Sequence, residues 1–217
     1  MIAIVDYGVG NLFSLSSSVK SLGAEIRVTR DADDLRAADH ILLPGVGAFA
    51  DAMAKLEATG LVPVIKEEAE KKPLLGICLG MQMMNTYFLV AEEAQRRGWS
   101  GTLLALFDQM KKERYMFTEP VDGHWNGHIT RDSVDSFKHP IRVEPGSRIE
   151  HLLGGSEILG ASMHNYRITH PAAALRVTGR TADGTIEALE YGDQMLGVQF
   201  HPEADATSDA LFQMICR

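Results

Sequence analysis

Cysteine is scarce in this 217-residue sequence, which contains only Cys78 and Cys216. Two cysteines give no disulfide framework, and so few are typical of a protein from a reducing compartment. A basic excess is also missing, because the formal net charge is −8. Nucleic-acid and anionic membrane surfaces depend on clusters of Lys and Arg, so neither nucleic acid nor membrane is expected as a partner.

Long apolar runs are missing as well. The segment 1–6 lacks the basic start and the extended apolar stretch of a signal peptide. No stretch of the sequence approaches the length of a transmembrane helix. With 45% hydrophobic residues, the chain has the size and apolar content of one domain spanning 1–217, and we expect it to be cytoplasmic.

Strands and helices alternate in the first part of the chain. The predicted strands cover 2–5, 25–28, 40–43 and 73–77, and the predicted helices cover 12–22, 32–38, 49–56, 62–71 and 81–95. Strands separated by helices indicate a parallel sheet covered on both faces.

The part of the chain after Pro140 changes character. Short strand-like runs are separated by turns, and a helix closes the chain; the runs cover 141–143, 158–159, 175–178, 186–190 and 195–198, and the helix covers 208–216. The predicted fold is therefore a three-layer α/β domain, with a mostly parallel central sheet and an antiparallel extension. The segment 96–138 is the hardest to interpret, with helices expected at 99–110 and 111–116 and a loop at 122–128.

A cysteine between two glycines follows the fourth predicted strand, in Gly76-Ile77-Cys78-Leu79-Gly80. A sharp turn from strand to helix needs glycine there, because a side chain would collide with the strand or the helix. Cys78 would then stand at a helix N-terminus, where unpaired N–H groups and the helix dipole favour a thiolate. A buried structural cysteine is the alternative, so the interpretation requires a base nearby.

His201 and Glu203 supply a candidate base at the end of the last predicted strand. Pro202 disfavours helix for the residue before it, and in extended chain two residues that are two apart point the same way. Glu203 is therefore able to orient the imidazole of His201. A cysteine, a histidine and an orienting group form a nucleophilic triad.

Together these motifs resemble the class I glutamine amidotransferases, whose glutaminase domain has a Gly-x-Cys-x-Gly elbow and a downstream His-Pro-Glu. The resemblance implies that Cys78 is the nucleophile, His201 the base and Glu203 the orienting carboxylate. Pro44-Gly45-Val46-Gly47 resembles the oxyanion strand of that family. The implied oxyanion-hole residues are Val46, Gly47 and Leu79, and the implied substrate-binding residues are Gly45, Gln82, His164, Asn165 and Tyr166.

Two branches of the family are both represented. The N-terminal motifs, 6–12, 43–49 and 76–82, resemble the glutaminase subunits of imidazole glycerol phosphate synthases, whereas the later motifs, 139–143, 161–164 and 183–188, resemble hydrolases of γ-glutamyl-γ-aminobutyrate. The synthase subunits usually have Met-Gly-Trp-Asn and His-Ser-Tyr segments, and this chain has Gly123-His124-Trp125-Asn126 and His164-Asn165-Tyr166. The hydrolases usually have arginine where this chain has Leu79.

The resemblance implies one chemistry for both branches, in which the thiolate attacks a γ-glutamyl carbonyl and water hydrolyses the thioester. No cofactor is expected. The first function is glutamine hydrolysis that supplies ammonia to a (β/α)8 cyclase or synthase subunit in histidine biosynthesis. The alternatives are a stand-alone hydrolase of γ-glutamyl amides, and a catalytically inert or engineered binding module with the same fold.

A metal site is conceivable from three histidines, His124, His128 and His139. The first two are four residues apart, a spacing that brings ligands together on a helix. Gly123 and Gly127 disfavour a helix at that position, so the sequence predicts loop histidines and no metal.

Overall fold

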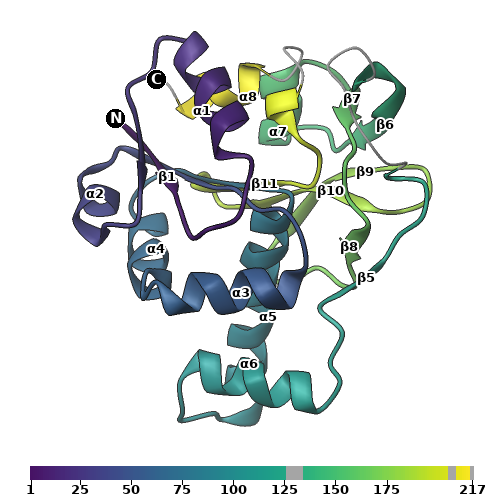
Figure 1. Cartoon of the computed structure of the whole chain (residues 1–217). Helices are drawn as coiled ribbons and strands as arrows, with labels where there is room; N and C mark the ends of the chain where they lie inside the picture. Colours follow the sequence, from purple (N-terminus) through teal and green to yellow (C-terminus); the bar gives the residue numbers. More distant parts are fainter. Residues whose placement is uncertain (126–133, 205–208, 216–217) are drawn as a thin grey trace.

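A nine-stranded sheet, flanked by helices on both faces, organises the chain in the computed structural model, which describes residues 1–125, 134–204 and 209–215. Figure 1 shows α1, α7 and α8 on one side of the sheet and α3, α4 and α5 on the other. The helices are α1 (Leu12–Ser21), α2 (Ala32–Ala37), α3 (Phe49–Ala58), α4 (Val62–Ala69), α5 (Leu79–Arg97), α6 (Leu103–Lys112), α7 (Arg148–Leu153) and α8 (Asp209–Ile215), with 3-10 turns η1 (Val134–Phe137) and η2 (Pro202–Ala204).

The strand order in this sheet is β2-β1-β3-β4-β11-β10-β9-β6-β7. The neighbours from β2 to β11 are parallel, and those from β11 to β7 are antiparallel. The strands are β1 (Ile2–Val5), β2 (Ile26–Thr29), β3 (His40–Leu43), β4 (Leu74–Ile77), β6 (Lys138–Val143), β7 (Glu157–Ala161), β9 (Arg176–Arg180), β10 (Ile186–Tyr191) and β11 (Met195–Val198). The parallel half and the antiparallel extension confirm the predicted three-layer α/β fold.

Local sequence explains the parallel half. Strands β1, β4 and β11 are buried at every position, and their near-continuous apolar runs are typical of strands covered by helices on both faces. Asn11 caps α1, because its side chain accepts a hydrogen bond from the N–H of Ser14. Gly98 ends α5 in the left-handed conformation that glycine adopts without a steric penalty.

Alternation along the strands divides the core into two layers. Within β1, Ala3 and Val5 belong to one cluster of buried apolar residues, and Ile2 and Ile4 belong to the other. Successive strand residues point to opposite faces of a sheet, so each cluster fills the space between the sheet and one helical layer. Phe200, which is fully buried, joins the second cluster just after β11.

The structure corrects several sequence predictions in the second part. A helix was expected over 99–110, and α6 begins at Leu103; the run 111–116 does not form a helix of its own, because α6 ends at Lys112 and Arg114 adopts a positive φ. Helix α7 and the two-stranded sheet of β5 (Thr118–Pro120) and β8 (Tyr166–Ile168) were not predicted. These strands are three residues long and, within the described part of the chain, pair only with each other, which leaves little periodicity in the sequence.

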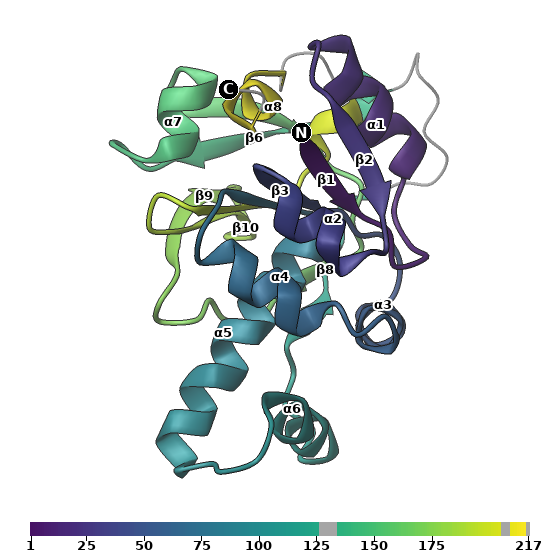
Figure 2. The same ribbon diagram turned by 90° about the vertical axis from the view of Figure 1, so that its left-hand side faces the viewer.

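Figure 2 shows α6 beside the end of α5 that is farther from the sheet. Arg97 joins the two helices, since its guanidinium binds the carboxylates of Glu93 on α5 and Glu113 after α6. Among the described residues, no helix combines the length and apolar character that crossing a lipid bilayer requires.

Candidate active site

Cys78 occupies a strained turn between β4 and α5. Its φ of 53° and ψ of −110° are unusual for a residue with a side chain. Glycine is required nearby, because a Cβ on Gly80 would lie 1.9 Å from the carbonyl oxygen of Leu43, and a Cβ on Gly76 would lie 3.0 Å from the backbone of Gly80. The predicted strand, elbow and helix are therefore present, and Cys78 is buried; Cys216 lies outside the described residues.

Strand β11 brings the base to the nucleophile. It pairs in parallel with β4, with Val198 opposite Ile77, and the N–H of Cys78 donates to the carbonyl oxygen of Val198 at 2.7 Å. His201 therefore follows the neighbouring strand at the same edge of the sheet as Cys78. Its N–H donates to the carbonyl oxygen of Ala161 at 2.9 Å, which fixes the backbone of the base.

Glu203 orients His201, with 2.8 Å between Nδ1 of the imidazole and Oε1 of the carboxylate. The sequence predicted this contact from extended backbone, but residues 202–204 form the 3-10 turn η2. The turn brings the two side chains together by folding the chain back. The remaining ring nitrogen is left for Cys78, which is near enough to help raise the pKa of the imidazole.

Neighbouring charges determine the protonation of His201 and Glu203. Burial alone would lower the pKa of His201, but the carboxylate of Glu203 and the thiol of Cys78 raise it well above its usual value of 6.5. Burial would raise the pKa of Glu203, and the His201 charge lowers it below its usual value of 4.5. An imidazolium beside an ionised carboxylate and a cysteine is the form in which a cysteine nucleophile is active.

Gln199 also contacts the nucleophile and was not identified from the sequence. Its Nε2 lies 3.4 Å from Sγ of Cys78, and its Oε1 accepts a hydrogen bond from Nε2 of Gln82 at 3.0 Å. The sequence could have identified Gln199 from its spacing, because it precedes the predicted base His201 by two residues at the end of a strand. In extended chain, that spacing places two side chains on the same side.

The oxyanion segment lies against the elbow. A Cβ on Gly45 would meet Cβ of Leu79 at 2.6 Å and the hydroxyl of Tyr7 at 2.8 Å, so only glycine allows this approach. Tyr7 Oη donates to the carbonyl oxygen of Pro44 at 2.6 Å, which anchors the segment, and burial together with Cys78 raises the pKa of its phenol. Gly47 adopts a φ of 92°. Gly45 therefore packs against Leu79, the residue that follows the nucleophile, and Val46 and Gly47 continue the same segment.

The predicted substrate-binding residues divide into two groups. Gln82 is buried and donates to the carbonyl oxygen of Tyr166 at 3.1 Å, which joins α5 to the segment 164–166. Asn165 and Tyr166 have exposed side chains. His164 is buried, and its Nε2 faces Glu187 at 3.2 Å. Gln82 and the 164–166 backbone therefore belong to one network with Cys78, whereas the His164 imidazole belongs to a separate polar cluster.

Comparison with known proteins gives this arrangement a context. The family model described as Peptidase C26 matches residues 52–203, which include the elbow, the base and the orienting carboxylate. A curated relative, "Imidazole glycerol phosphate synthase subunit HisH" of Moorella thermoacetica, is 39% identical over 93% of this chain and 87% of its own length. The protein of the same name from Methanopyrus kandleri is 35% identical over 93% of this chain and 90% of its own length.

Solved structures share the fold. A protein of Thermoplasma acidophilum, described as belonging to a GMP synthase, superposes with a TM-score of 0.64 at 20% identity, covering 99% of this chain and 92% of its own. A structure described as glutamine amidotransferase gives a TM-score of 0.63 at 17% identity, covering 100% and 99%. At these identities the likeness concerns the fold alone.

Proposed function

Since this chain belongs to the peptidase C26 family and to the HisH family of imidazole glycerol phosphate synthase subunits, we propose that it hydrolyses glutamine to glutamate and ammonia for such a synthase. One observation carries the proposal: a cysteine at a strained elbow lies beside a buried imidazole, whose pKa it helps to raise and which a carboxylate orients. That arrangement is a complete nucleophilic triad.

The reaction follows from these groups in two stages. The thiolate of Cys78 attacks the γ-carbonyl carbon of glutamine, and the backbone N–H groups at Leu79 and at the Val46–Gly47 turn stabilise the oxyanion. His201 gives its proton to the leaving amine, so ammonia departs and a γ-glutamyl thioester remains. The imidazole then removes a proton from water, water attacks the thioester, and glutamate leaves as the thiolate is restored.

We propose a (β/α)8 cyclase subunit as the partner that consumes the ammonia. The relatives are named as subunits of a synthase, and a subunit acts together with another chain, which supports a partner for this chain too. This chain differs from the usual synthase subunits at 123–126 and 164–166, so docking on a cyclase is tested directly in the assay below.

The second candidate is a stand-alone γ-glutamyl hydrolase. The motifs at 139–143 and 183–188 favour it, because they resemble the hydrolases of γ-glutamyl-γ-aminobutyrate. It uses the same Cys78 chemistry on a different leaving amine. A catalytically inert module is the third possibility, which the contacts between Cys78, His201 and Glu203 argue against.

One assay separates the three. The purified chain is incubated with glutamine or with γ-glutamyl-γ-aminobutyrate, with and without the cyclase subunit of an imidazole glycerol phosphate synthase, and released glutamate and ammonia are measured. We expect glutamine turnover that depends on the cyclase and is lost in Cys78→Ala. Turnover of the dipeptide alone would favour the hydrolase, and turnover of neither substrate would favour the inert module. Activity that survives Cys78→Ala would overturn the mechanism.

A further inference from the structure

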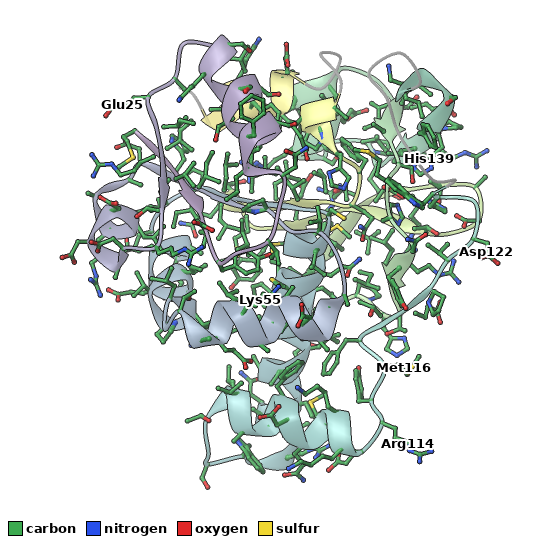
Figure 3. All side chains as sticks on the ribbon, in the orientation of Figure 1. Glu25, Lys55, Arg114, Met116, Asp122 and His139 are labelled. Atoms are coloured by element: carbon green, nitrogen blue, oxygen red, sulfur yellow. The ribbon has the colours of Figure 1, made fainter. Side chains whose placement is uncertain are left out.

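Three imidazoles converge on one buried carboxylate outside the catalytic triad. Oε1 of Glu187, on β10, lies 3.2 Å from Nε2 of His164, 3.3 Å from Nε2 of His139 and 3.5 Å from Nδ1 of His124. Glu187 has no exposed surface, and His124 is 6% exposed. Figure 3 shows His139 on the same side of the molecule as Asp122, away from Glu25. The cluster draws its members from four separate segments of the chain.

Within the described part of the chain, Nδ1 of His124 has no hydrogen-bond donor beside it, although it carries a lone pair. Its Nε2 lies 3.2 Å from Oδ2 of Asp183, an acceptor, so this nitrogen carries the proton. Its Nδ1 lies 3.2 Å from Oγ of Ser162, but that hydroxyl donates to the carbonyl oxygen of His124 at 2.9 Å. The Nδ1 lone pair therefore faces the acceptor oxygens of Ser162 and Glu187, an arrangement that a cation between them would relieve.

Two further atoms of the cluster are buried without a hydrogen-bond partner among the described residues. They are Oε2 of Glu187 and Nε2 of His139, whose approach to Glu187 lacks hydrogen-bond geometry. Buried polar atoms are ordinarily satisfied, and each exception needs an explanation. An ion that accepts electron pairs from a carboxylate oxygen and an imidazole nitrogen would satisfy both.

We propose that His124, His139 and Glu187 bind a divalent transition-metal ion of the zinc type. One nitrogen or oxygen from each residue lies within 4.8 Å of the other two. Zinc takes two histidines and a glutamate with a fourth position left open, and a tetrahedral ion with bonds of about 2.1 Å holds its ligand atoms about 3.4 Å apart. The 3.3 Å and 3.5 Å separations from Oε1 of Glu187 to His139 and His124 match that spacing.

The surroundings have the features of a metal centre. Asp183 accepts from the outer nitrogen of His124, and a carboxylate in that position fixes the orientation of a ligating imidazole. Nδ1 of His164 lies 3.1 Å from the carbonyl oxygen of Tyr166, which also accepts from Gln82. The ion would thus tie β6 and β10 together, next to the backbone network that leads to Cys78.

The sequence argued against a metal because His124 and His128 could not share a helix. His128 lies outside the described residues, so the structure does not place it. Glu187 was not predicted as a ligand, since nothing in its local sequence marks it as one. The proposal concerns this second site alone and does not depend on the proposed glutaminase activity.

Cobalt provides the test, because tetrahedral Co²⁺ absorbs visible light. The full chain is treated with a chelator, dialysed and titrated with CoCl2, and Zn²⁺ is then added in competition; bound metal is counted by atomic emission. We expect one ion per chain, displaced by Zn²⁺. Glu187→Gln and His139→Ala remove a ligand and should abolish stoichiometric binding, whereas the exposed His170→Ala should leave it unchanged.

Asp183→Asn keeps the test decisive if the ligand variants fail to fold. The Asp183 side chain is 44% exposed, so the variant should fold, and loss of its support for His124 should weaken binding about 10- to 100-fold. Circular dichroism verifies the fold of each variant. Absence of stoichiometric uptake by the wild type, or equal affinity in Asp183→Asn, Glu187→Gln and the wild type, overturns the proposal; the cluster would then be an imidazole–carboxylate network without metal.

Discussion

The side-chain amide of Gln199 donates a hydrogen bond to the thiol of Cys78, with Nε2 3.4 Å from Sγ. Its orientation is determined by the opposite end, since Oε1 accepts from Nε2 of Gln82 at 3.0 Å. An amide that receives a donor at its oxygen must present its NH2 group to the sulfur. Gln199 and Gln82 therefore connect the nucleophile to the carbonyl of Tyr166.

Gln199→Leu should lower kcat for glutamine hydrolysis about fivefold, because one hydrogen bond of about 1 kcal/mol to the nucleophile is lost. Steady-state kinetics with the partner subunit present measure the effect. Gln213→Leu, at an exposed position of α8, is the matched control and should retain wild-type kcat. An unchanged kcat in Gln199→Leu would show that this contact does not assist the thiol.

Glu203→Gln should reduce kcat by about 10² to 10⁴-fold, because the amide no longer stabilises the imidazolium that protonates the leaving amine. Burial lowers the pKa of His201, and one of the two groups that raise it would be removed, so this pKa should fall. The alkaline limb of the pH–rate profile then moves to lower pH. Titration of His201 followed by NMR checks the shift, and a pKa equal to that of the wild type would contradict the role of Glu203.

Gly80→Ala should destabilise the chain by more than about 3 kcal/mol, since overpacking usually costs about 1–3 kcal/mol and here the new Cβ meets rigid backbone. That Cβ would lie 1.9 Å from the carbonyl oxygen of Leu43. Gly60→Ala is the control: its φ is 71° but its Cβ meets nothing within 4 Å, so only the backbone cost of about 1–2 kcal/mol applies. Urea unfolding compares the two, and equal losses would refute the steric argument.

Acid should release α6 from α5 before the sheet unfolds. Hydrogen bonds from Arg96 and Arg97 lower the pKa of Glu93 to about 2 despite its burial, and those from Arg97 and Gln109 lower the pKa of Glu113 to about 2. A lowered carboxyl pKa contributes stability that is present above pH 4.5 and is lost as the pH falls toward 2.

Fluorescence of Trp99, which donates to the carbonyl oxygen of Thr102 between these helices, follows that release. Glu113→Gln removes one titrating group, so its signal should change less between pH 5 and about 2 than that of the wild type. Glu157→Gln, an exposed change on β7, should follow the wild-type curve. Identical curves for all three proteins would exclude the Arg97 network as the cause.

Sequence predicted the parallel half of the fold well because its signals are local. The elbow needs glycine on both sides of Cys78, and the buried strands are short apolar runs that end at turns. The contact between His201 and Glu203 was also predicted, although the backbone that makes it is a 3-10 turn. Pro202 restricts the backbone of the residue before it, but it does not determine the conformation of the residues that follow.

The remainder depends on contacts between distant segments. Among the residues that the structure describes, β5 and β8 pair only with each other, so neither segment alone carries a strand signal. Glu187 lies in a buried strand, and its approach to His139 follows from the order of β10, β9 and β6 in the sheet. Sequence spacing gives no information about the cluster of His124, His139 and Glu187, since the three residues belong to separate segments of the chain.

The position of β11 has a consequence for how the chain acquires activity. It is the last strand in the sequence, yet it lies between β4 and β10 in the interior of the sheet. The two halves of the sheet therefore join only after residue 198 is available, and such long-range closure is slow relative to local folding. Until β11 joins the sheet, Cys78 has no base beside it. A partly folded chain can therefore neither consume glutamine nor release ammonia.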